Sequence, residues 1–319
     1  FAAYNLVGLC GAGAIIMDAL VLTVLLTSVP LILAATGELI AEKSGVLNLG
    51  VEGMMLMGAV AAFAVTSFSG NPYFGIVSAA LAGGTTAAVF AVFALGLATN
   101  QVATGLALTI FGAGLSGLIG APYVGGTIEG LSVLAIPFLS DLPVLGGLFF
   151  KLDLLAYLSV VMLGLVGFFL NSTRAGLILR AIGNNHESAH ALGYSVLRVR
   201  CGAVIFGGVM AGLAGAYLPL VLTPHWSEGM TAGRGWIALA LVVFASWMPS
   251  RILIGALLFG GITIMQLAGQ ARGWEMPSQF LSMLPYLATI AVLVLISRDR
   301  DFALMRAPAH LGRIFIGTK

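Results

Sequence analysis

Residues 37–69 read GELIAEKSGVLNLGVEGMMLMGAVAAFAVTSFS, a polar stretch that leads directly into an apolar one. A helix that crosses a bilayer needs about 20 mostly apolar residues, and the run from Val51 to Ser69 meets that length. The charged side chains before it lie among apolar neighbours, where an ionised group is costly. The stretch therefore predicts a membrane helix that begins beside a buried polar site.

The composition of the whole chain agrees with a membrane protein. Hydrophobic residues make up 60% of the 319 residues and charged residues only 8%, whereas about a quarter of a soluble domain is charged. The net charge of +2 is too small to indicate a nucleic-acid partner. Apolar runs lie near residues 19–36, 51–69, 73–98, 102–120, 153–170, 201–222, 235–248, 252–268 and 281–297. We expect an all-α, polytopic integral membrane protein, with residues 1–319 forming one domain of roughly 8–10 transmembrane helices, some broken or re-entrant.

Arginines indicate the orientation of the chain in the membrane. They are concentrated in two connecting segments, residues 171–200 and 298–319. The first segment contains Arg174, Arg180, Arg198 and Arg200. Loops rich in Lys and Arg stay on the cytoplasmic side, so both segments, and with them the C-terminus, are predicted to be cytoplasmic. Four apolar runs separate the two segments, an even number, which is consistent with this placement.

Two polar residues stand out next to the run that starts at Val51. Asn48 and Glu52 are four residues apart, so in a helix they would share a face. Polar residues within the membrane usually line a pathway or join helices. For Glu38, Glu42 and Lys43 two interpretations stay open: a solvated cytoplasmic loop, or part of the same pathway.

A second polar stretch leads into an apolar run at residues 222–245, LTPHWSEGMTAGRGWIALALVVFA. Broken helices in corresponding positions of two halves are typical of a transporter's central site. If the two stretches meet, Arg234 could neutralise Glu52, and Trp236 could stack on a ring of the solute. Asn100 and Gln101, followed by Thr104, form a third polar lead into a helix, either as part of the pathway or as a helix cap.

The segment His186-Glu187-Ser188-Ala189-His190 matches H-E-x-x-H, the zinc-binding pattern of metallopeptidases. A catalytic zinc needs a third protein ligand, and the cationic surroundings disfavour a divalent metal. The alternative is a short cytoplasmic helix over residues 184–194, capped by Asn184 or Asn185 and ended by Gly193. Such a helix suits docking into a groove of a soluble partner.

Residues 181–194, AIGNNHESAHALGY, resemble the ATPase-coupling loop of permease subunits of bacterial ATP-binding-cassette importers. The resemblance is to the branch that serves branched-chain amino acids, simple sugars and nucleosides, and His186 and Ser188 depart from its usual proline and alanine. The stretch GELIAEKSGVLNLGVEGMMLMGA and residues 138–150 and 231–240 resemble further motifs of its nucleoside-like members. The coupling-loop residues implied by the resemblance are Ala181, Gly183, Asn184, Asn185, Glu187, Ala189, Gly193 and Tyr194.

The resemblance implies a complex in the bacterial inner membrane and no enzyme activity in this chain. Its partners would be a cytoplasmic ATP-binding subunit, a second permease subunit, identical or different, and an external solute-binding protein. ATP and magnesium would bind the ATPase partner, and this chain would bind no cofactor or metal; the P-loop pattern is absent from its sequence. Nucleosides are the favoured solute, followed by simple sugars. The pathway candidates are Asn48, Glu52, Asn100, Thr104, Arg234 and Trp236. A membrane zinc peptidase and an ion-coupled secondary transporter remain as alternatives.

Overall fold

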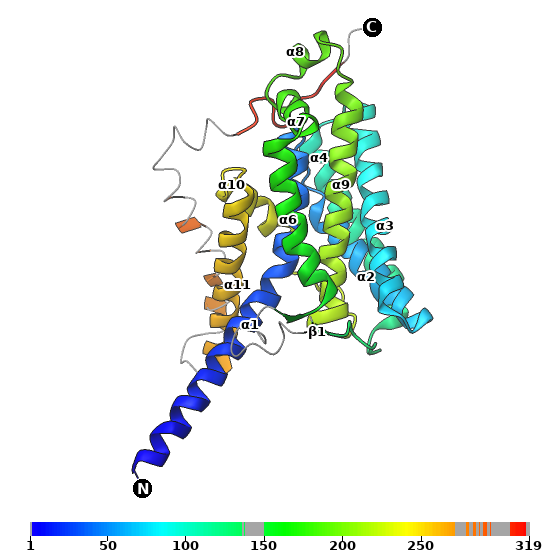
Figure 1. The fold of residues 1–319 in the computed structure, drawn as a ribbon. Coiled ribbons are helices and arrows are strands. Elements are labelled where there is room, and N and C mark those ends of the chain that lie inside the picture. The colour runs from blue at the N-terminus through cyan, green and yellow to red at the C-terminus, as the bar shows by residue number, and fades with distance from the viewer. Residues whose placement is uncertain are drawn as a thin grey trace.

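The computed structural model describes residues 2–135, 137, 150–271, eight residues scattered from 279 to 294 (at 279, 280, 283, 284, 287, 290, 291 and 294), and 307–316, with side chains from Ala19 onwards. Within these residues seven helices are long and apolar enough to cross a membrane. They are α1 (Ala2–Lys43, apolar from Ala19), α2 (Val51–Ser69), α3 (Pro72–Ala91), α4 (Gln101–Gly120), α6 (Leu154–Ser172), α9 (Val196–Tyr217) and α11 (Pro249–Ala271) (Figure 1). The expected all-α membrane fold is confirmed.

Shorter elements connect these spans. They are α7 (Arg174–Asn184), α8 (His186–Ala191), α10 (Arg234–Phe244) and the paired strands β1 (Leu134–Ala135) and β2 (Lys151–Leu152). The π-helical segments Val92–Gly96 and Leu218–Leu222 extend α3 and α9, and a single 3-10 turn, Ala121–Tyr123, follows α4. Residues 138–149 of the motif at 138–150, most of the run at 281–297 and residues 298–306 lie outside the described residues.

The prediction of a full span at 235–248 is wrong. Helix α10 has 11 residues, which at 1.5 Å per residue gives about 16 Å, roughly half the bilayer core of about 30 Å. It ends where Ser246 and Trp247 take left-handed backbone conformations, with φ of 49° and 55°. The chain therefore turns into α11 before it has crossed a membrane.

Local sequence signals explain where several helices begin. The Asn71 side chain accepts a hydrogen bond from Tyr73 N, and the Asp153 side chain accepts one from Ala156 N. Pro72 occupies the first turn of α3, where a missing N–H costs nothing. Helix α2 ends at Gly70, whose φ of 67° suits a glycine C-cap.

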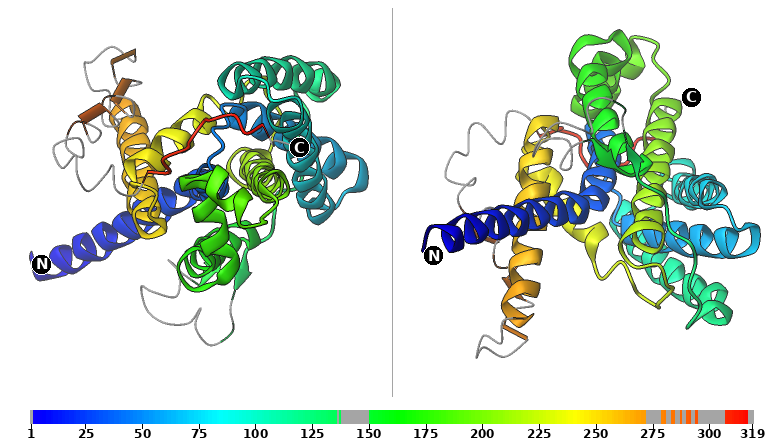
Figure 2. Two further views of the ribbon diagram at one scale, coloured as in Figure 1. Left: turned by 90° about the horizontal axis from the view of Figure 1, so that it is seen from above. Right: turned by 60° about the horizontal axis from the view of Figure 1, so that its bottom comes forward.

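Helix α9 lies at the centre of the bundle and packs against α1, α2 and α3 (Figures 1 and 2). Glycine makes the close approach possible: a Cβ on Gly58 would collide with the Gly212 backbone, and one on Gly83 with Gly208. Membrane helices associate largely through such small-residue contacts, because lipid is as apolar as the side chains it replaces. The Gly208–Gly212 spacing in the sequence thus marks the main helix crossing.

The polar stretch of residues 44–50 turns back alongside α1. Asn48 N donates to Glu38 Oε1 at 3.4 Å, so this loop packs against α1 before the end of that helix at Lys43. Asn48 precedes α2, which starts at Val51. The prediction that Asn48 and Glu52 share one helical face is therefore wrong, because the backbone between them is not helical.

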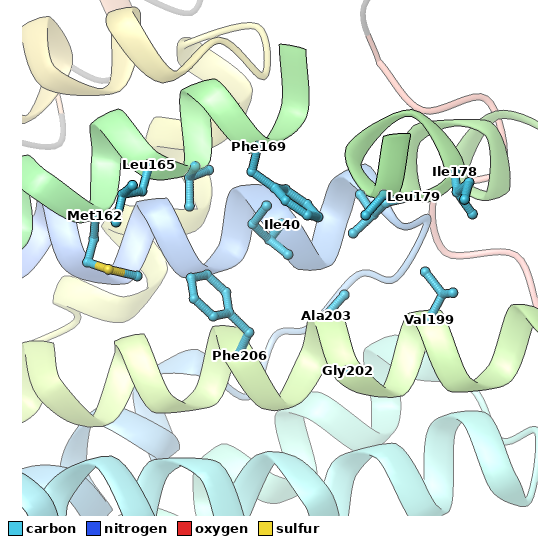
Figure 3. Close-up of a pocket in the computed structure, with 12 residues that line it drawn as sticks. Ile40, Met162, Leu165, Phe169, Ile178, Leu179, Val199, Gly202, Ala203 and Phe206 are labelled. Carbon is cyan, nitrogen blue, oxygen red and sulfur yellow. The ribbon is translucent and has the colours of Figure 1, made fainter. Parts of the chain in front are cut away.

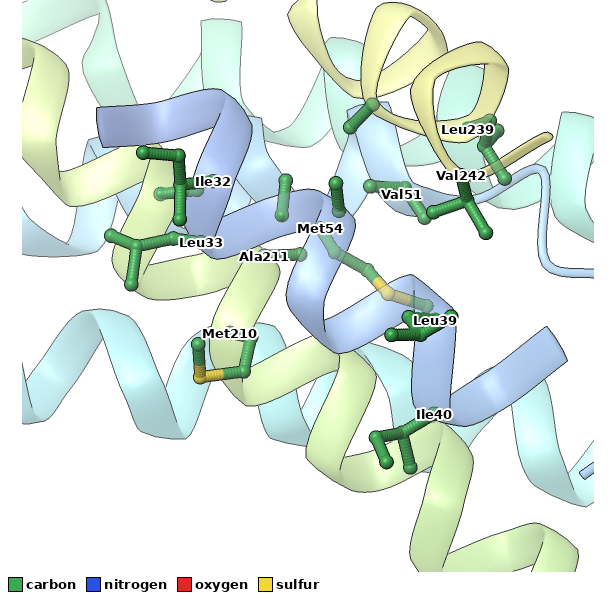
Figure 4. Close-up of a cluster of buried hydrophobic side chains, with 14 of the residues drawn as sticks. Ile32, Leu33, Leu39, Ile40, Val51, Met54, Met210, Ala211, Leu239 and Val242 are labelled. Carbon is green, nitrogen blue, oxygen red and sulfur yellow. The ribbon is translucent and has the colours of Figure 1, made fainter. Parts of the chain in front are cut away.

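Apolar side chains fill the space between the half-length α10 and the long helices. Ile32, Leu39, Met54, Leu239 and Val242 belong to one cluster of buried residues. Figure 4 shows these side chains converging from α1, α2 and α10. This packing holds α10 against the start of α2, where the polar site lies.

Candidate functional site

The carboxylate of Glu52 joins the two polar stretches of the chain. Its Oε1 accepts hydrogen bonds from Thr231 Oγ1 at 2.5 Å and Gly233 N at 2.8 Å, and its Oε2 accepts one from Gly235 N at 2.6 Å. Glu52 is only 6% exposed. Residues about 180 positions apart therefore meet, a condition that the sequence left open.

The electrostatics of this junction come from the start of α10. The first N–H groups of a helix have no partner within the helix and carry partial positive charge. A carboxylate placed there is stabilised, and Glu52 occupies that position while it also lies in the first turn of α2. The acid thus interacts with the N-terminal ends of two helices at once.

Glycines permit this close contact. Gly233 has a φ of 79°, which favours glycine. A Cβ on Gly235 would lie 2.6 Å from the Glu52 Cα. Between them, Arg234 Nη1 donates to the carbonyl oxygens of Met230 and Thr231, both at 3.1 Å. The Gly-Arg-Gly sequence therefore shapes the turn that presents N–H groups to Glu52.

Two further acids, Glu38 and Glu42, are buried within α1, each 1% exposed. Trp247 Nε1 donates to Glu42 Oε2 at 2.5 Å, while Glu38 Oε2 has no hydrogen-bond partner among the described residues. The interpretation as a solvated loop is wrong for these two residues, because α1 continues to Lys43 and places them inside the bundle.

The remaining pathway candidates lie in different surroundings. Asn48 is fully buried, and its Oδ1 accepts from Gly50 N at 3.0 Å. Asn100 is exposed and caps α4 by accepting from Ala103 N at 3.0 Å. Thr104 exchanges a hydrogen bond with Thr99, 2.8 Å between hydroxyl oxygens. Trp236, in the first turn of α10, is 50% exposed. The capping interpretation of Asn100 is thus confirmed, and a pathway role for these residues stays a prediction.

Gln101 was outside the predicted site although it follows Asn100. Its side chain is 2% exposed, and Oε1 accepts from Leu47 N at 2.9 Å. This bond ties the start of α4 to the loop that leads into α2. The sequence shows a glutamine just before an apolar run, which marks it as unusual. It does not show the hydrogen-bond partner, which is 54 residues away.

The predicted docking helix is present as α8. The Asn185 side chain accepts from Ser188 N at 3.0 Å and caps the helix. At its other end Gly193 has a φ of 86° and its N–H bonds to His190 O at 2.8 Å. Glu187 and Leu192 are exposed, whereas Ala189 is buried against Ile182 and Val196. One face of α8 is thus held by the protein and the other is available to a partner.

The other residues of the predicted coupling loop surround α8. Gly183 is buried, and a Cβ there would collide with the carbonyl of Lys43. Ala181 and Asn184 are exposed, and Tyr194 is half-buried, with its N–H bonded to Ala189 O at 3.1 Å. The loop therefore rests directly on the end of α1.

Arg200 connects α8 to the bundle. Its side chain is fully buried, with Nε donating to Ser44 O, Nη1 to Arg313 O and Nη2 to His186 Nδ1, each at 3.1 Å. The prediction that Arg200 is a loop residue is wrong, because Arg200 belongs to α9. Burial could not be foreseen because its three acceptors come from distant segments.

His186 lies between Arg200 and His310. A guanidinium can only donate, so His186 Nδ1 accepts from Arg200; the Nδ1 atoms of His186 and His310 are 2.9 Å apart. Burial, then the charge of Arg200, lowers the pKa of His186 to about 4, and burial also lowers the pKa of His310. An adjacent guanidinium disfavours a divalent metal, and no suitable cluster of three or more ligands occurs among the described residues.

Two cavities border α7. One, of about 470 Å³, is lined only by apolar residues of α1, α6, α7 and α9, among them Ile40, Phe169, Leu179 and Phe206 (Figure 3). The other, of about 710 Å³, includes Lys43, Arg180 and Trp247 in its wall. The apolar cavity lacks hydrogen-bonding groups for a polar solute, so it does not extend the predicted pathway.

Comparison with known proteins agrees with this architecture. The sequence profile described as "Branched-chain amino acid transport system / permease component" matches residues 20–293. TsgC13 of Haloferax volcanii, provisionally named a glucose ABC transporter permease protein, is 42% identical over 82% of this chain and 87% of its own length.

Two nucleoside permeases are also similar. The nucleoside ABC transporter permease protein NupC of Lactococcus lactis is 34% identical over 88% of this chain and 92% of its own length. The guanosine ABC transporter permease protein NupQ of Bacillus subtilis is 29% identical over 87% of this chain and 92% of its own length. No solved structure is significantly similar.

Proposed function

We propose that this chain, which belongs to the family of branched-chain amino acid transport system permease components, is the membrane-spanning subunit of an ATP-driven importer for a small polar solute. The observation that carries the proposal is α8. It is a capped helix in the connection between α6 and α9, and one of its faces packs on the bundle. Leu192, at its end, is 78% accessible. An exposed apolar side chain beside a docking helix suits a soluble partner protein.

The partner would be a cytoplasmic ATP-binding subunit, since this chain contains no P-loop of its own. ATP and magnesium would bind that subunit, and this chain would bind no cofactor. A second permease subunit and an external solute-binding protein would complete the complex in the bacterial inner membrane. The arginines of the 171–200 segment favour a cytoplasmic position for α8 and for residues 307–316, which lie at the same end of the bundle.

The contacts around α8 suggest how its movement would reach the membrane. His186 at the start of α8 bonds to Arg200 of α9, and Arg200 bonds to Ser44 in the loop that leads to α2. Helix α9 packs against α1, α2 and α3. A push on α8 by the ATPase would therefore shift α9 and the 44–50 loop together, and with them the Glu52 junction with α10.

For the solute we favour nucleosides, with simple sugars as the second candidate. Similarity to NupC and NupQ supports the first, and similarity to TsgC13 supports the second. Both kinds of solute carry several hydroxyl groups and a ring, which would suit polar groups near a half-exposed tryptophan such as Trp236. The proposed route includes Asn48, Glu52, Asn100, Thr104, Arg234 and Trp236.

The test is uptake by the complete complex in proteoliposomes, with labelled guanosine and glucose supplied with the binding protein. We expect uptake that needs internal ATP and persists when ion gradients are abolished. Uptake that stops with the ion gradient and ignores ATP would instead establish a secondary transporter.

The same assay tests α8 directly through Gly193→Val. Valine is strained at a φ of 86°, so the end of α8 should distort, and the ATP-binding subunit should be lost on purification with a fall in uptake of about tenfold or more. Gly125→Val is the matched control, since Gly125 has a φ of 84° but lies after α4. Equal retention of the ATPase by both variants would contradict the role of α8.

A further inference from the structure

The described part of the C-terminal region, residues 307–316, crosses the end of the bundle that carries α8 (Figures 1 and 2). We call these residues the C-terminal strap. They lie beyond residue 293, where the match to the family profile ends. The family profile therefore does not account for the contacts of the strap.

Backbone hydrogen bonds attach the strap to three separate elements. His310 N donates to Gly183 O at the end of α7, at 2.9 Å, and Gly312 N donates to Gly45 O after α1, at 3.1 Å. Arg313 O accepts from Arg200 of α9 at 3.1 Å. Because the strap bonds to both Gly183 and Gly45, it links the ATPase-coupling loop with the loop that leads to Asn48 and Glu52.

Side chains attach the strap to α8 itself. The Phe315 ring packs edge-on against His186 and His190, with ring centroids 5.2 Å and 5.3 Å apart. Phe315 also contacts the buried cluster of Ile182, Ala189 and Val196 that holds the inner face of α8. The position of α8 therefore depends on the strap.

The strap and α8 leave apolar side chains exposed outside the membrane spans. Leu192 at the end of α8 is 78% accessible, and Ile316 and Ile314 of the strap are 77% and 42% accessible. Lipid does not account for them, since both segments lie outside the spanning helices. Arg198 and Arg313, also exposed, add positive charge to the same end of the molecule.

From these contacts we infer that the strap and α8 form one composite docking surface for the ATP-binding subunit. The partner is then a soluble protein whose apolar groove receives Leu192 and Ile316 and whose rim is acidic. The strap also transmits the movement of α8 to the 44–50 loop through Gly45. This inference rests on the proposed function, because it extends the docking site assigned there to α8.

The test uses the full-length complex, purified through a tag on the ATP-binding subunit. Ile316→Glu and Leu192→Glu each place a charge on the surface, and Phe68→Glu is the control, because Phe68 is 93% exposed at the far end of α2. We expect the first two changes to reduce the co-purified permease about tenfold or more and the control to leave it unchanged. All three residues are exposed, so the fold should survive, as a monodisperse elution of each permease would verify.

The outcomes separate the two proposals. If Leu192→Glu releases the partner and Ile316→Glu does not, α8 docks the ATPase but the composite surface is overturned. If neither releases it, the docking role of α8 and the proposed function built on it fail as well.

Transmission through the strap is tested by Phe315→Ala. We expect the complex to keep hydrolysing ATP while solute uptake per ATP falls several-fold, because α8 loses the packing of Phe315 against His186 and His190. An unchanged ratio of uptake to hydrolysis would overturn the transmitting role.

Discussion

At the scale of single residues, Glu52 joins two polar stretches that lie about 180 residues apart in the chain. Three hydrogen bonds from Thr231, Gly233 and Gly235 converge on one buried carboxylate. Hydrogen bonds to an ionised acceptor are stronger than those between neutral groups. Glu52 thus stabilises the start of α10 as well as providing charge near the proposed route.

Glu52→Gln tests this role. Glutamine has one oxygen in place of two, so its NH₂ group must face one of the N–H or O–H donors that now bond to the carboxylate. Two donors then point at each other, and about 1–3 kcal/mol of stability should be lost. We expect a lower midpoint of thermal unfolding in detergent and reduced uptake. Glu129→Gln, at an exposed acid, is the control. Identical midpoints for both variants would show that Glu52 does not hold the junction.

The sequence indicated that Glu52 is unusual but did not identify its partners. An acid at the start of an apolar run is visible locally, and so is the Gly-Arg-Gly turn. The sequence suggested Arg234 as a counter-ion for Glu52 if the two polar stretches meet, and the structure places backbone N–H groups of Gly233 and Gly235 in contact with the carboxylate. Residue types do not reveal such groups, since every residue except proline has an N–H.

At the scale of elements, α8 and the strap are joined by a pair of histidines, His186 and His310, whose pKa values are both lowered by burial. His186 Nδ1 faces Arg200, and Arg313 adds positive charge, while Glu187 acts in the opposite direction. With its pKa lowered to about 4, His186 binds fewer protons in the folded than in the unfolded protein between that value and the usual 6.5. The contact is therefore fully stabilising above about pH 6.5 and weakens as the pH falls towards 4.

Hydrogen exchange would measure this pH dependence. Corrected for intrinsic rates, exchange in residues 184–194 and 307–316 should rise relative to the spans as the pH is lowered from 6.5. His186→Gln, which cannot become charged, should reduce the rise, and His310, whose pKa is also lowered, accounts for what remains. A rise of the same size in that variant would assign the effect to another group.

Among the elements, those with local signals were predicted well and those without were not. The Asn185 cap and the left-handed Gly193 delimit α8 in the sequence and in the structure. The length of α10 was overestimated because apolar residues continue past Phe244, although the backbone turns at Ser246. Hydropathy reports how apolar the side chains of a segment are. A half-length helix packed in the bundle and a helix that crosses the membrane are both apolar, so hydropathy does not distinguish them.

At the scale of the whole molecule, the position of α9 depends on glycine. Gly212 approaches both α2 and α3 so closely that a Cβ would collide with the Ala79 carbonyl. Contacts of this kind replace the hydrophobic effect as the force that joins helices in lipid. The central helix therefore sets the arrangement of its neighbours.

Gly212→Val should disrupt this arrangement. The added side chain must separate the helices, and overpacking of this kind costs roughly 1–3 kcal/mol or more. Gly202→Val is the control on the same helix, since a Cβ there meets nothing within 4 Å. We expect a clearly lower unfolding midpoint for the first variant alone, measured in the same detergent. A comparable change in both would point to helix propensity and not to packing.

The sequence by itself determined the membrane class, most of the spans, the helix caps and the family resemblance, because these follow from apolar length, capping side chains and contiguous motifs. Only the tertiary structure decided that Arg200 is buried, that Glu38 and Glu42 lie inside the bundle, that Glu52 meets α10, and that the strap holds α8. Each of these depends on groups far apart in the chain, often on backbone atoms. A buried charge is favourable only where such groups converge, and convergence is a property of the folded chain.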